Sequence, residues 1–303
     1  MAGAICTSPL RTWYRALSTL RSGLRNDGAG MRDVVVTGSF DNLGSKQVRF
    51  LEGASTLGRV HVMMWSDEVV RALEGKTPEF PAQERLYLLQ AIRYVGDVRV
   101  VTGQVERDTI PEIDETRPEI WAVDEAGDTP EKRAYCRSRG VCYRVLSLES
   151  LRGFPLARLN AQKEQALRKK VIVTGCFDWF HSGHVRFFEE VSQLGDMYVV
   201  VGHDANVRLL KGEGHPLFPQ EERRYMVQSV RYVKQAMIST GNGWMDAEPE
   251  IALIKPDVYV VNEDGDQPEK RAFCEAQGIQ YVVLKRIPKE GLPQRHSTDL
   301  RGF

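Results

Sequence analysis

The chain has 303 residues, and 41 Lys and Arg balance 41 Asp and Glu, so its formal net charge is zero. This balance gives no reason to expect a nucleic-acid or anionic-membrane partner, and no apolar stretch approaches the roughly 18 residues of a membrane span. The length fits one or two globular domains, and five cysteines without CxxC spacing favour unpaired thiols in a reducing compartment such as the cytoplasm.

Residues 1–30 differ in composition from the rest of the chain. Arginines are interspersed with Ser and Thr, and Asp27 is the only acidic residue. This composition resembles an organellar transit peptide. A disordered extension ahead of a start at Met31 explains it equally well, so both alternatives stay open, import into an organelle included.

From residue 31 onward the sequence repeats itself. Residues 34–41 (VVVTGSFD) match residues 171–178 (VIVTGCFD) at an offset of 137. Residues 127–146 match residues 265–284 at an offset of 138, with 12 of 20 positions identical. A period of this length is too long for a solenoid and indicates a duplicated whole domain.

We therefore predict two domains, residues 31–155 and 171–303. Residues 156–170 between them are charged, rich in helix formers and free of Gly and Pro, which predicts a helical connector. Each domain reads as strand, turn, helix, strand, loop, helix and strand, with a final helix. The strands are continuous apolar runs, as in residues 197–201 and 258–261. Such runs alternating with helices are typical of an α/β fold whose parallel sheet has helices on both faces.

One helix of the second domain carries clear end signals. Pro268 fits the first helical position, where its missing N–H costs nothing, and Gly278 fits the position just past the end. Residues 127–133 repeat this layout in the first domain. We interpret both segments as capped structural helices.

The segment with the strongest chemical signal is residues 171–188 (VIVTGCFDWFHSGHVRFF). It predicts a strand, a polar turn and the start of a helix, which together gather backbone N–H groups and the positive end of a helix dipole. His181 and His184 project from this turn, so an anionic ligand suits the site, although histidines in such turns are often only polar surface residues. A zinc site would need two further ligands, and no paired Cys or His follows Cys176, which disfavours a metal.

Residues 174–184 resemble the TGxFDxxHxGH signature of the cytidylyltransferase-like nucleotidyltransferases. Ser297 and Thr298 resemble that family's second signature, a Ser-Thr step that opens a late helix. The resemblance implies two tandem Rossmann-like nucleotidyltransferase domains. It also implies transfer of a nucleotidyl group from a nucleoside triphosphate to a phosphomonoester, with release of pyrophosphate.

The resemblance also implies roles for individual residues. His181 and His184 contact the triphosphate and stabilise the transition state, and Lys211 is the family's mobile-loop lysine, unless it is only a solvated surface residue. Mg²⁺ is expected to ride on the nucleotide phosphates without a dedicated carboxylate cage. The implied nucleotide-binding residues are Gly175, Cys176, Phe177, Glu263, Asp264, Arg295, Ser297 and Thr298. The candidates on the acceptor side are Asp178, Asp204, Arg223 and Trp244.

Some of these residues keep a second interpretation. Either aspartate fits a helix cap or turn as well as an acceptor site, and Trp244 fits a buried core as well as a stacking site. The segment around Arg295 is shorter than the family's pattern, which leaves the role of this arginine open.

The two copies differ at the positions implied to handle phosphate. The first copy has Gly44, Gln47, Glu74, Leu146 and Glu149 where the second has His181, His184, Lys211, Arg295 and Thr298. The apolar core positions persist while the phosphate-handling residues are lost together. We conclude that residues 171–303 form the catalytic domain and residues 31–155 a degenerate partner, which we expect to pack against it as a pseudo-dimer; two chains could also form a homodimer.

For the substrates, the tandem organisation is most similar to that of the ethanolamine-phosphate cytidylyltransferases. We therefore predict a cytidylyl transfer from CTP to a phosphoethanolamine-like acceptor, as in phospholipid biosynthesis. One alternative is an adenylyltransferase that uses ATP on a sugar phosphate, because such relatives carry a very similar Leu-Lys-Gly loop. Another is a nucleotide-binding protein without turnover.

Overall fold

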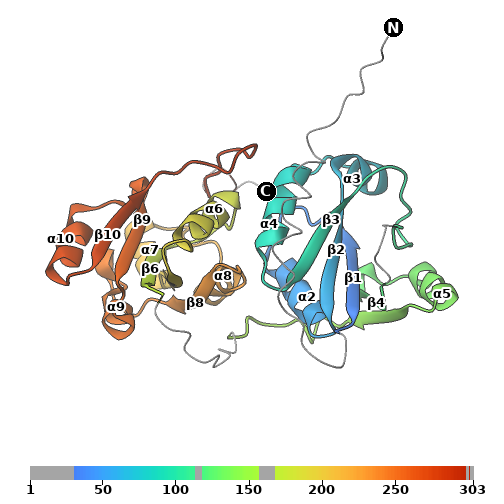
Figure 1. Cartoon of the computed structure of the whole chain (residues 1–303), viewed down its shortest axis with the longest axis horizontal. Coiled ribbons are helices and arrows are strands. Elements are labelled where there is room, and N and C mark those ends of the chain that lie inside the picture. The colour runs from blue at the N-terminus through green and yellow to red at the C-terminus, as the bar shows by residue number, and fades with distance from the viewer. Residues whose placement is uncertain (1–30, 113–117, 157–167, 298–299, 301–303) are drawn as a thin grey trace, which may run out of the picture. The chain divides into compact units, whose positions relative to one another are not determined.

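The computed structural model describes residues 31–112, 118–156, 168–297 and 300. The predicted extension, residues 1–30, and most of the predicted helical connector, residues 156–170, lie outside this range. The described chain forms two five-stranded parallel sheets with helices on both faces (Figure 1). This confirms the predicted α/β fold with two Rossmann-like units, called here the first half (residues 31–155) and the second half (from residue 170).

The first half has the strand order β3-β2-β1-β4-β5, and all its strand pairs are parallel. Its elements are β1 Asp33–Gly38, α2 Ser45–Ser55, β2 Arg59–Trp65, α3 Asp67–Glu74, α4 Ala82–Ala91, β3 Val95–Val101, β4 Ile120–Asp124, the 3-10 turn η2 Glu125–Gly127, α5 Pro130–Arg139 and β5 Cys142–Leu146.

The second half repeats this topology as β8-β7-β6-β9-β10. Its elements are β6 Lys170–Gly175, α6 Ser182–Val191, β7 Asp196–Val201, α7 Asp204–Lys211, α8 Gln220–Gln228, β8 Val233–Ile238, η3 Gly243–Met245, α9 Glu248–Ile254, β9 Val258–Asn262, η4 Glu263–Gly265, α10 Pro268–Ala276 and β10 Gln280–Leu284. Equivalent elements lie 137 or 138 residues apart, as the internal repeat predicts.

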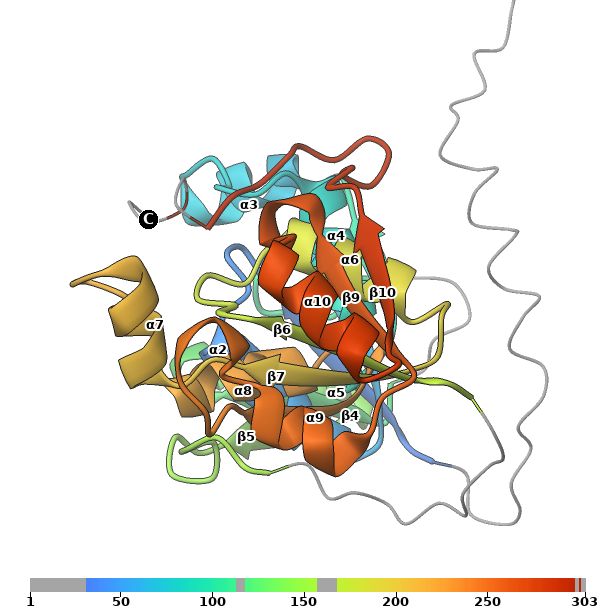
Figure 2. The same cartoon turned by 90° about the vertical axis from the view of Figure 1, so that its left-hand side faces the viewer.

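The position of β6 in its sheet decides where a ligand can bind. The next strand along the chain, β7, lies on one side of β6, and β9 lies on the other. In a parallel sheet, such a change of direction opens a crevice outside the carboxyl ends of the two central strands. The second view shows α7 near the end of β7, and the chain beyond β10 leading away from the sheet (Figure 2).

Local sequence explains the ends of several helices. Helix α10 begins at Pro268, and Gly278 follows its end with a left-handed φ of +67°. Helix α5 likewise begins at Pro130, its N-cap Thr129 accepts a hydrogen bond from the amide of Lys132, and Gly140 is left-handed. Both predicted structural helices are therefore confirmed.

Other predicted elements differ from the structure. An additional helix, α3 or α7, follows the second strand of each half where only a loop was predicted, and the sheets have five strands each. The predicted final helix of the first half is a turn at residues 148–151, closed by a hydrogen bond from the amide of Leu151 to the oxygen of Ser147. This segment is too short to add helical hydrogen bonds beyond that turn.

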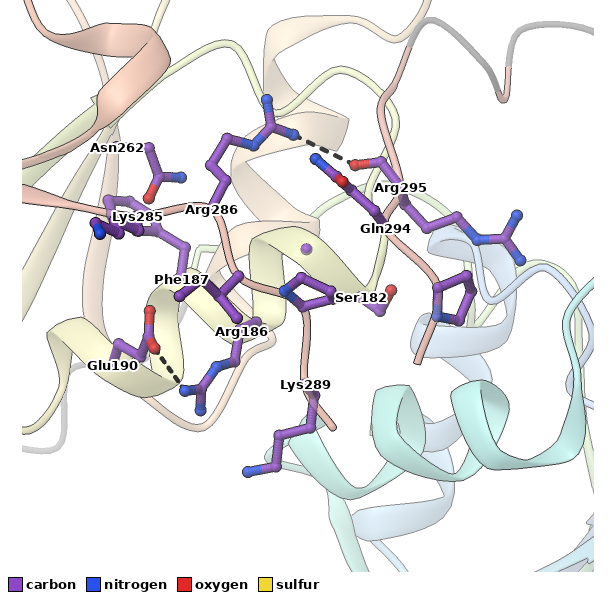
Figure 3. Close-up of a pocket in the computed structure, with 14 residues that line it drawn as sticks. Ser182, Arg186, Phe187, Glu190, Asn262, Lys285, Arg286, Lys289, Gln294 and Arg295 are labelled. Atoms are coloured by element: carbon purple, nitrogen blue, oxygen red, sulfur yellow. Dashed lines mark hydrogen bonds and ion pairs between the residues drawn. The ribbon is translucent and has the colours of Figure 1, made fainter. Parts of the chain in front are cut away.

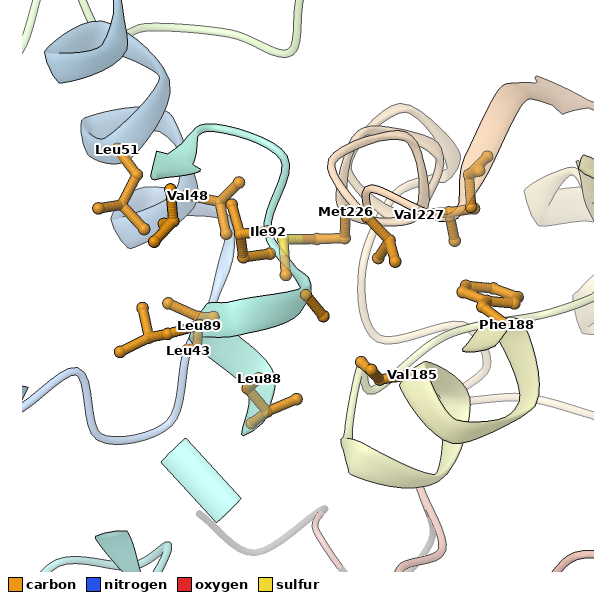
Figure 4. Packing of buried hydrophobic residues seen from close by; sticks show 14 of the residues in the cluster. Leu43, Val48, Leu51, Leu88, Leu89, Ile92, Val185, Phe188, Met226 and Val227 are labelled. Carbon is orange, nitrogen blue, oxygen red and sulfur yellow. The ribbon is translucent and has the colours of Figure 1, made fainter. Parts of the chain in front are cut away.

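The two halves share one apolar layer. Helices α2 and α4 contribute Leu51 and Leu89, and helices α6 and α8 contribute Val185 and Met226, all buried in the same cluster (Figure 4). Burying a side chain of this size stabilises a fold by about 1.5–3 kcal/mol relative to leaving it exposed. The shared layer therefore stabilises both halves together.

Polar contacts between the halves come in reciprocal pairs. An antiparallel bridge joins Ile92 to the equivalent Val230. The other contacts also occur twice, with the two halves exchanged: a residue of the first half contacts one of the second half, and their equivalents make the same contact in the opposite direction. They are Ser45 to Glu222 and Ser182 to Glu84, each at 2.6 Å, and Tyr87 to Glu189 and Tyr225 to Glu52, each at 2.7 Å. Equivalent surfaces thus meet within one chain as predicted, whereas a homodimer stays a prediction.

Among the described helices, none combines the length and apolar composition needed to cross a bilayer. The cysteines at positions 136, 142, 176 and 274 are free thiols.

A buried ionic cluster lies near the amino ends of β1, β2 and β3. In His61, Nε2 lies 2.8 Å from Oδ1 of Asp33, and Nδ1 lies 2.7 Å from Oδ2 of Asp97. A carboxylate close to each ring nitrogen favours the doubly protonated ring, because ionised carboxylates attract positive charge and only accept hydrogen bonds. The hydrogen bond with Asp97 raises the pKa of His61, burial opposes this shift, and Asp33 adds to it. The structure therefore favours an imidazolium at this position.

We expect the stability of the protein to fall as the pH rises through the folded-state pKa of His61. A histidine whose pKa is raised by folding stabilises fully below its unfolded pKa of about 6.5 and loses this contribution above its folded pKa. The urea midpoint should therefore decrease as the pH is raised from about 6 to 9, and His61→Gln should flatten the decrease. Tyr198→Phe, at the equivalent position of the second half, should leave it in place. A wild-type midpoint that is constant with pH would contradict the imidazolium.

Candidate functional site

The two predicted histidines form the start of helix α6. His181 is the N-cap, and its Nδ1 accepts a hydrogen bond from the amide of Gly183 at 3.1 Å. The amide of His181 in turn donates to Nδ1 of His184 at 3.4 Å. The two rings stack with their centroids 4.0 Å apart. Because both Nδ1 atoms accept hydrogen bonds, each neutral ring carries its proton on Nε2, which leaves two N–H donors side by side.

Both histidines are held in the neutral form when no ligand is bound. Burial lowers the pKa of His181 to about 3, with further lowering from the charges of Arg286, His296 and Arg295. Burial also lowers the pKa of His184, with contributions from His181, Arg286 and Lys211. Arg286, Arg295 and Lys211 carry positive charges near the two rings, so an anion placed beside the rings would be attracted by these three side chains.

Lys211 is the last residue of α7, so the predicted mobile-loop position is wrong in this detail. Its backbone is helical, and the chain leaves the helix at Gly212 with φ +86°, followed by Gly214 with φ +81°. The side chain is exposed, and its charge acts on His184 and on the Cys176 thiol. It therefore lies on the side of the sheet where the histidines are.

Arg286 is a residue that the sequence analysis missed. It follows β10, its Nη1 lies 2.6 Å from Oδ2 of Asp264, and its amide donates to Glu263 at 3.3 Å. The predicted pair Glu263 and Asp264 forms η4 beyond β9 and holds this arginine. A signal was present: the offset between the copies rises from 138 in β10 to 149 at Leu300, so the second half has an insertion between them.

The end of the chain returns to the start of α6. Nη2 of Arg286 donates to the backbone oxygen of Arg295 at 3.3 Å, as Figure 3 shows, and Oγ of Ser297 donates to the oxygen of Trp179 at 3.2 Å. The side chain of Arg295 points away from η4 and contacts the carboxylate of Glu84 in the first half. Thr298 lies outside the described residues.

The histidine pair is held in place by the preceding turn, which contains Gly175, Cys176 and Phe177. Phe177 has a positive φ of +53°, and its ring lies 5.4 Å from the ring of His184. A Cβ at Gly175 would approach the Phe177 ring to 2.9 Å, so glycine is required there. Burial raises the pKa of the Cys176 thiol. These residues therefore fix the position of an imidazole, and the thiol stays protonated near neutral pH.

Asp178, Asp204 and Arg223 have internal partners. Asp178 accepts hydrogen bonds from the amides of Leu217 and Phe218, and Nη2 of Arg223 lies 2.7 Å from Oδ1 of Asp204. The first half repeats both arrangements, with Asp41 accepting from the amides of Glu79 and Phe80, and Arg85 paired with Asp67. Contacts present in both halves, including the half without the histidines, point to the fold rather than to an acceptor.

Trp244 is the candidate that stays open to solvent. It lies in η3 with 61% of its surface exposed, so the alternative of a core residue is wrong. The neighbouring Gly243 exchanges two hydrogen bonds with Asn206 of α7. A stacking role for Trp244 stays a prediction.

The start of α2 shows what the first half kept and lost. There the amide of the N-cap Gly44 donates to Oε1 of Gln47 at 3.2 Å, which reproduces the contact of His184 without an imidazole. The last residue of α3 is Glu74 at the position of Lys211. The first half has therefore kept the helix cap while losing both ring donors and reversing a charge.

Comparison with known proteins points to one family. A family model described as cytidylyltransferase-like matches residues 172–301. The FAD synthase of Ferroglobus placidus is 37% identical over 125 residues, which are 40% of this chain and 78% of the relative. The FAD synthase of Aciduliprofundum boonei is 34% identical over 136 residues, covering 44% of this chain and 84% of the relative.

A third relative, the bifunctional protein HldE of Nitratiruptor sp., is 32% identical over 118 residues, which are 38% of this chain but 25% of that protein. None of these three relatives supports the expected likeness to ethanolamine-phosphate cytidylyltransferase.

We expect His184→Ala to lower turnover by about 10²- to 10³-fold, because it removes one preorganised donor from developing phosphate charge. Gln47→Ala removes the equivalent helix cap from the first half and should leave turnover within about twofold. Steady-state rates of the two purified variants, with thermal unfolding as a check on folding, make the comparison. Similar losses in both would contradict the assignment of the chemistry to the second half.

Proposed function

The chain belongs to the cytidylyltransferase-like family, and we propose that its second half transfers an adenylyl group from ATP to a phosphomonoester and releases pyrophosphate. The observation that carries this proposal is the pair of neutral imidazoles at the start of α6. Their Nδ1 atoms accept hydrogen bonds from backbone amides, so each neutral ring carries its proton on Nε2, and the charges of Lys211 and Arg286 act on the pair.

The reaction needs charge stabilisation more than covalent chemistry. An oxygen of the acceptor phosphate attacks the α-phosphorus, and the bond from that phosphorus to the departing pyrophosphate breaks. Negative charge grows on the oxygens of the transferring group and the pyrophosphate, where fixed N–H donors and cations stabilise it. The attacking phosphate oxygen is already anionic near neutral pH, so no side chain has to remove a proton.

The choice of ATP rests on the relatives. FAD contains an adenylyl group joined to a flavin phosphate, so two of the three relatives are named for a product of adenylyl transfer. This favours adenylyl transfer from ATP over the predicted cytidylyl transfer from CTP to a phosphoethanolamine-like acceptor. A sugar phosphate and a flavin phosphate are both phosphomonoesters, and either satisfies the chemistry above.

Magnesium would be held by the nucleotide in this proposal. Asp178, Asp204 and Asp264 each have internal partners, and within the described residues no group of three or more His, Cys, Asp or Glu side chains could hold a metal ion. This donor set fits a Mg²⁺ bound by phosphate oxygens and water, which would neutralise part of the phosphate charge. The side chains described above bind and orient the phosphates.

Pyrophosphate release from the purified chain tests the proposal. Each of the four nucleoside triphosphates is combined with flavin mononucleotide, sugar 1-phosphates or phosphoethanolamine. We expect release with ATP and one of the first two acceptor classes, and about 10²- to 10³-fold slower release from the His184→Ala variant. Release with CTP alone would overturn the choice of ATP, and no release with any pair would overturn the transferase and favour nucleotide binding without turnover.

We expect Lys211→Glu, which copies Glu74 of the first half, to lower kcat/KM for the nucleotide at least tenfold. The change replaces attraction to a triphosphate with repulsion, and solvent screening keeps the effect below that of a buried donor. The matched control is Glu74→Lys in the first half, which should leave kcat/KM unchanged. Initial rates at several salt concentrations provide the measurement. A Lys211→Glu enzyme as active as the wild type would show that this lysine is only a solvated residue.

A further inference from the structure

Helix α4 of the first half lies against the chain segment that follows β10 in the second half. The contact is close, because a Cβ at Gly291 would lie 2.5 Å from Nε2 of Gln83. Lys289 of the same segment donates to Glu189 of α6 at 2.8 Å, and Tyr87 of α4 donates to that carboxylate at 2.7 Å. The inserted segment of the second half is therefore packed on a helix of the degenerate half.

Glu84 of α4 lies at the centre of this contact and is fully buried. One of its oxygens accepts from Oγ of Ser182 at 2.6 Å, and the other accepts from Nη2 of Arg295 at 2.8 Å. Nε of Arg295 lies 3.2 Å from both oxygens. Hydrogen bonds between charged groups in a buried setting are among the strongest and most directional in proteins.

The two partners of Glu84 are both next to the histidine pair. Ser182 is the first residue of α6 and directly follows His181. The backbone oxygen of Arg295 lies 3.6 Å from where a Cβ of Gly183 would be, so the chain at Arg295 rests on the first turn of α6. The same oxygen accepts from Arg286, whose charge acts on both imidazoles. A displacement of Arg295 would therefore move the groups that surround the two donors.

The pseudo-symmetric counterpart lacks this second partner. Glu222 of α8 accepts from Oγ of Ser45 at 2.6 Å, which matches the contact of Glu84 with Ser182. The position equivalent to Arg295 in the first half is Leu146. The serine contact thus belongs to the packing of the two halves, whereas among the described residues the arginine contact occurs only at the half with the histidines.

We propose that Glu84 of the degenerate half is a positioning residue for the phosphate site, acting through Arg295 and the first turn of α6. The site in the second half is then incomplete without a carboxylate from the first half. This inference rests on the proposed function, because it assumes that the histidine pair binds nucleotide phosphates.

The test compares Glu84→Gln with Glu222→Gln. Both variants weaken an equivalent serine contact between the halves, but only Glu84→Gln removes the negative charge that orients Arg295. We expect Glu84→Gln to raise KM for the nucleotide about tenfold with a smaller change in kcat, and Glu222→Gln to change each less than twofold. Calorimetric titration with inorganic tripolyphosphate should show the same tenfold weakening for Glu84→Gln only.

A double-mutant comparison separates positioning from general stability. Arg295→Gln should weaken tripolyphosphate binding, and adding Glu84→Gln to it should weaken binding no further, because the two residues act as one unit. If the two substitutions together weaken tripolyphosphate binding by the product of their separate factors, the proposal is overturned. Should Glu84→Gln fail to fold, Arg295→Lys, which cannot span both carboxylate oxygens, must still raise KM, and an unchanged KM would overturn it.

Two failures can be told apart. A wild-type chain that neither releases pyrophosphate nor binds tripolyphosphate overturns the proposed function, and the role of Glu84 falls with it. An active wild type in which Glu84→Gln and Glu222→Gln behave alike overturns the positioning role and leaves the proposed function standing.

Discussion

The first turn of α6 is the constraint on which the rest of the structure depends. A helix start leaves backbone N–H groups without partners, and here two imidazole nitrogens, one from His181 and one from His184, accept from them. Capping fixes the tautomer with the proton on Nε2 and holds the rings in a stack. The hydrogen bonds that cap the start of the helix therefore also set the N–H donors of the rings. Burial keeps the rings neutral when no anion is bound.

This dual use explains how one copy could lose its chemistry without losing its fold. Gln47 accepts from the amide of Gly44 just as His184 accepts from that of His181, so α2 keeps its cap while the ring donor is gone. The ion pairs that both halves contain, such as Arg85 with Asp67 in the first half, are retained. Within this turn, the atoms that cap the helix are therefore different from the atoms proposed to bind phosphate.

The first half also contributes to the second. The shared apolar layer and the reciprocal serine–glutamate contacts join the halves, and the contact of Ser182 with Glu84 is buried where an unsatisfied group would be costly. Only on the side of the histidines does an additional residue, Arg295, join the buried carboxylate of Glu84. Under our proposal, the half without the histidine pair is still needed to hold the segment beside that pair.

The sequence by itself determined the α/β class, the duplication and the half that carries the histidines, because alternating apolar runs, a period of 137 to 138 residues and a strand-turn-helix motif are local or periodic signals. It placed Lys211 in a loop, whereas helix α7 ends at this residue, since a single helical turn more or less leaves little trace in composition. Only the tertiary structure separated Arg223 and Asp204, which pair with each other, from side chains free to meet a substrate. Only it revealed the approach of Arg286 to the imidazoles and of Glu84 to Arg295. Such contacts join residues far apart in the chain, and no local pattern encodes which distant charges the packing brings together.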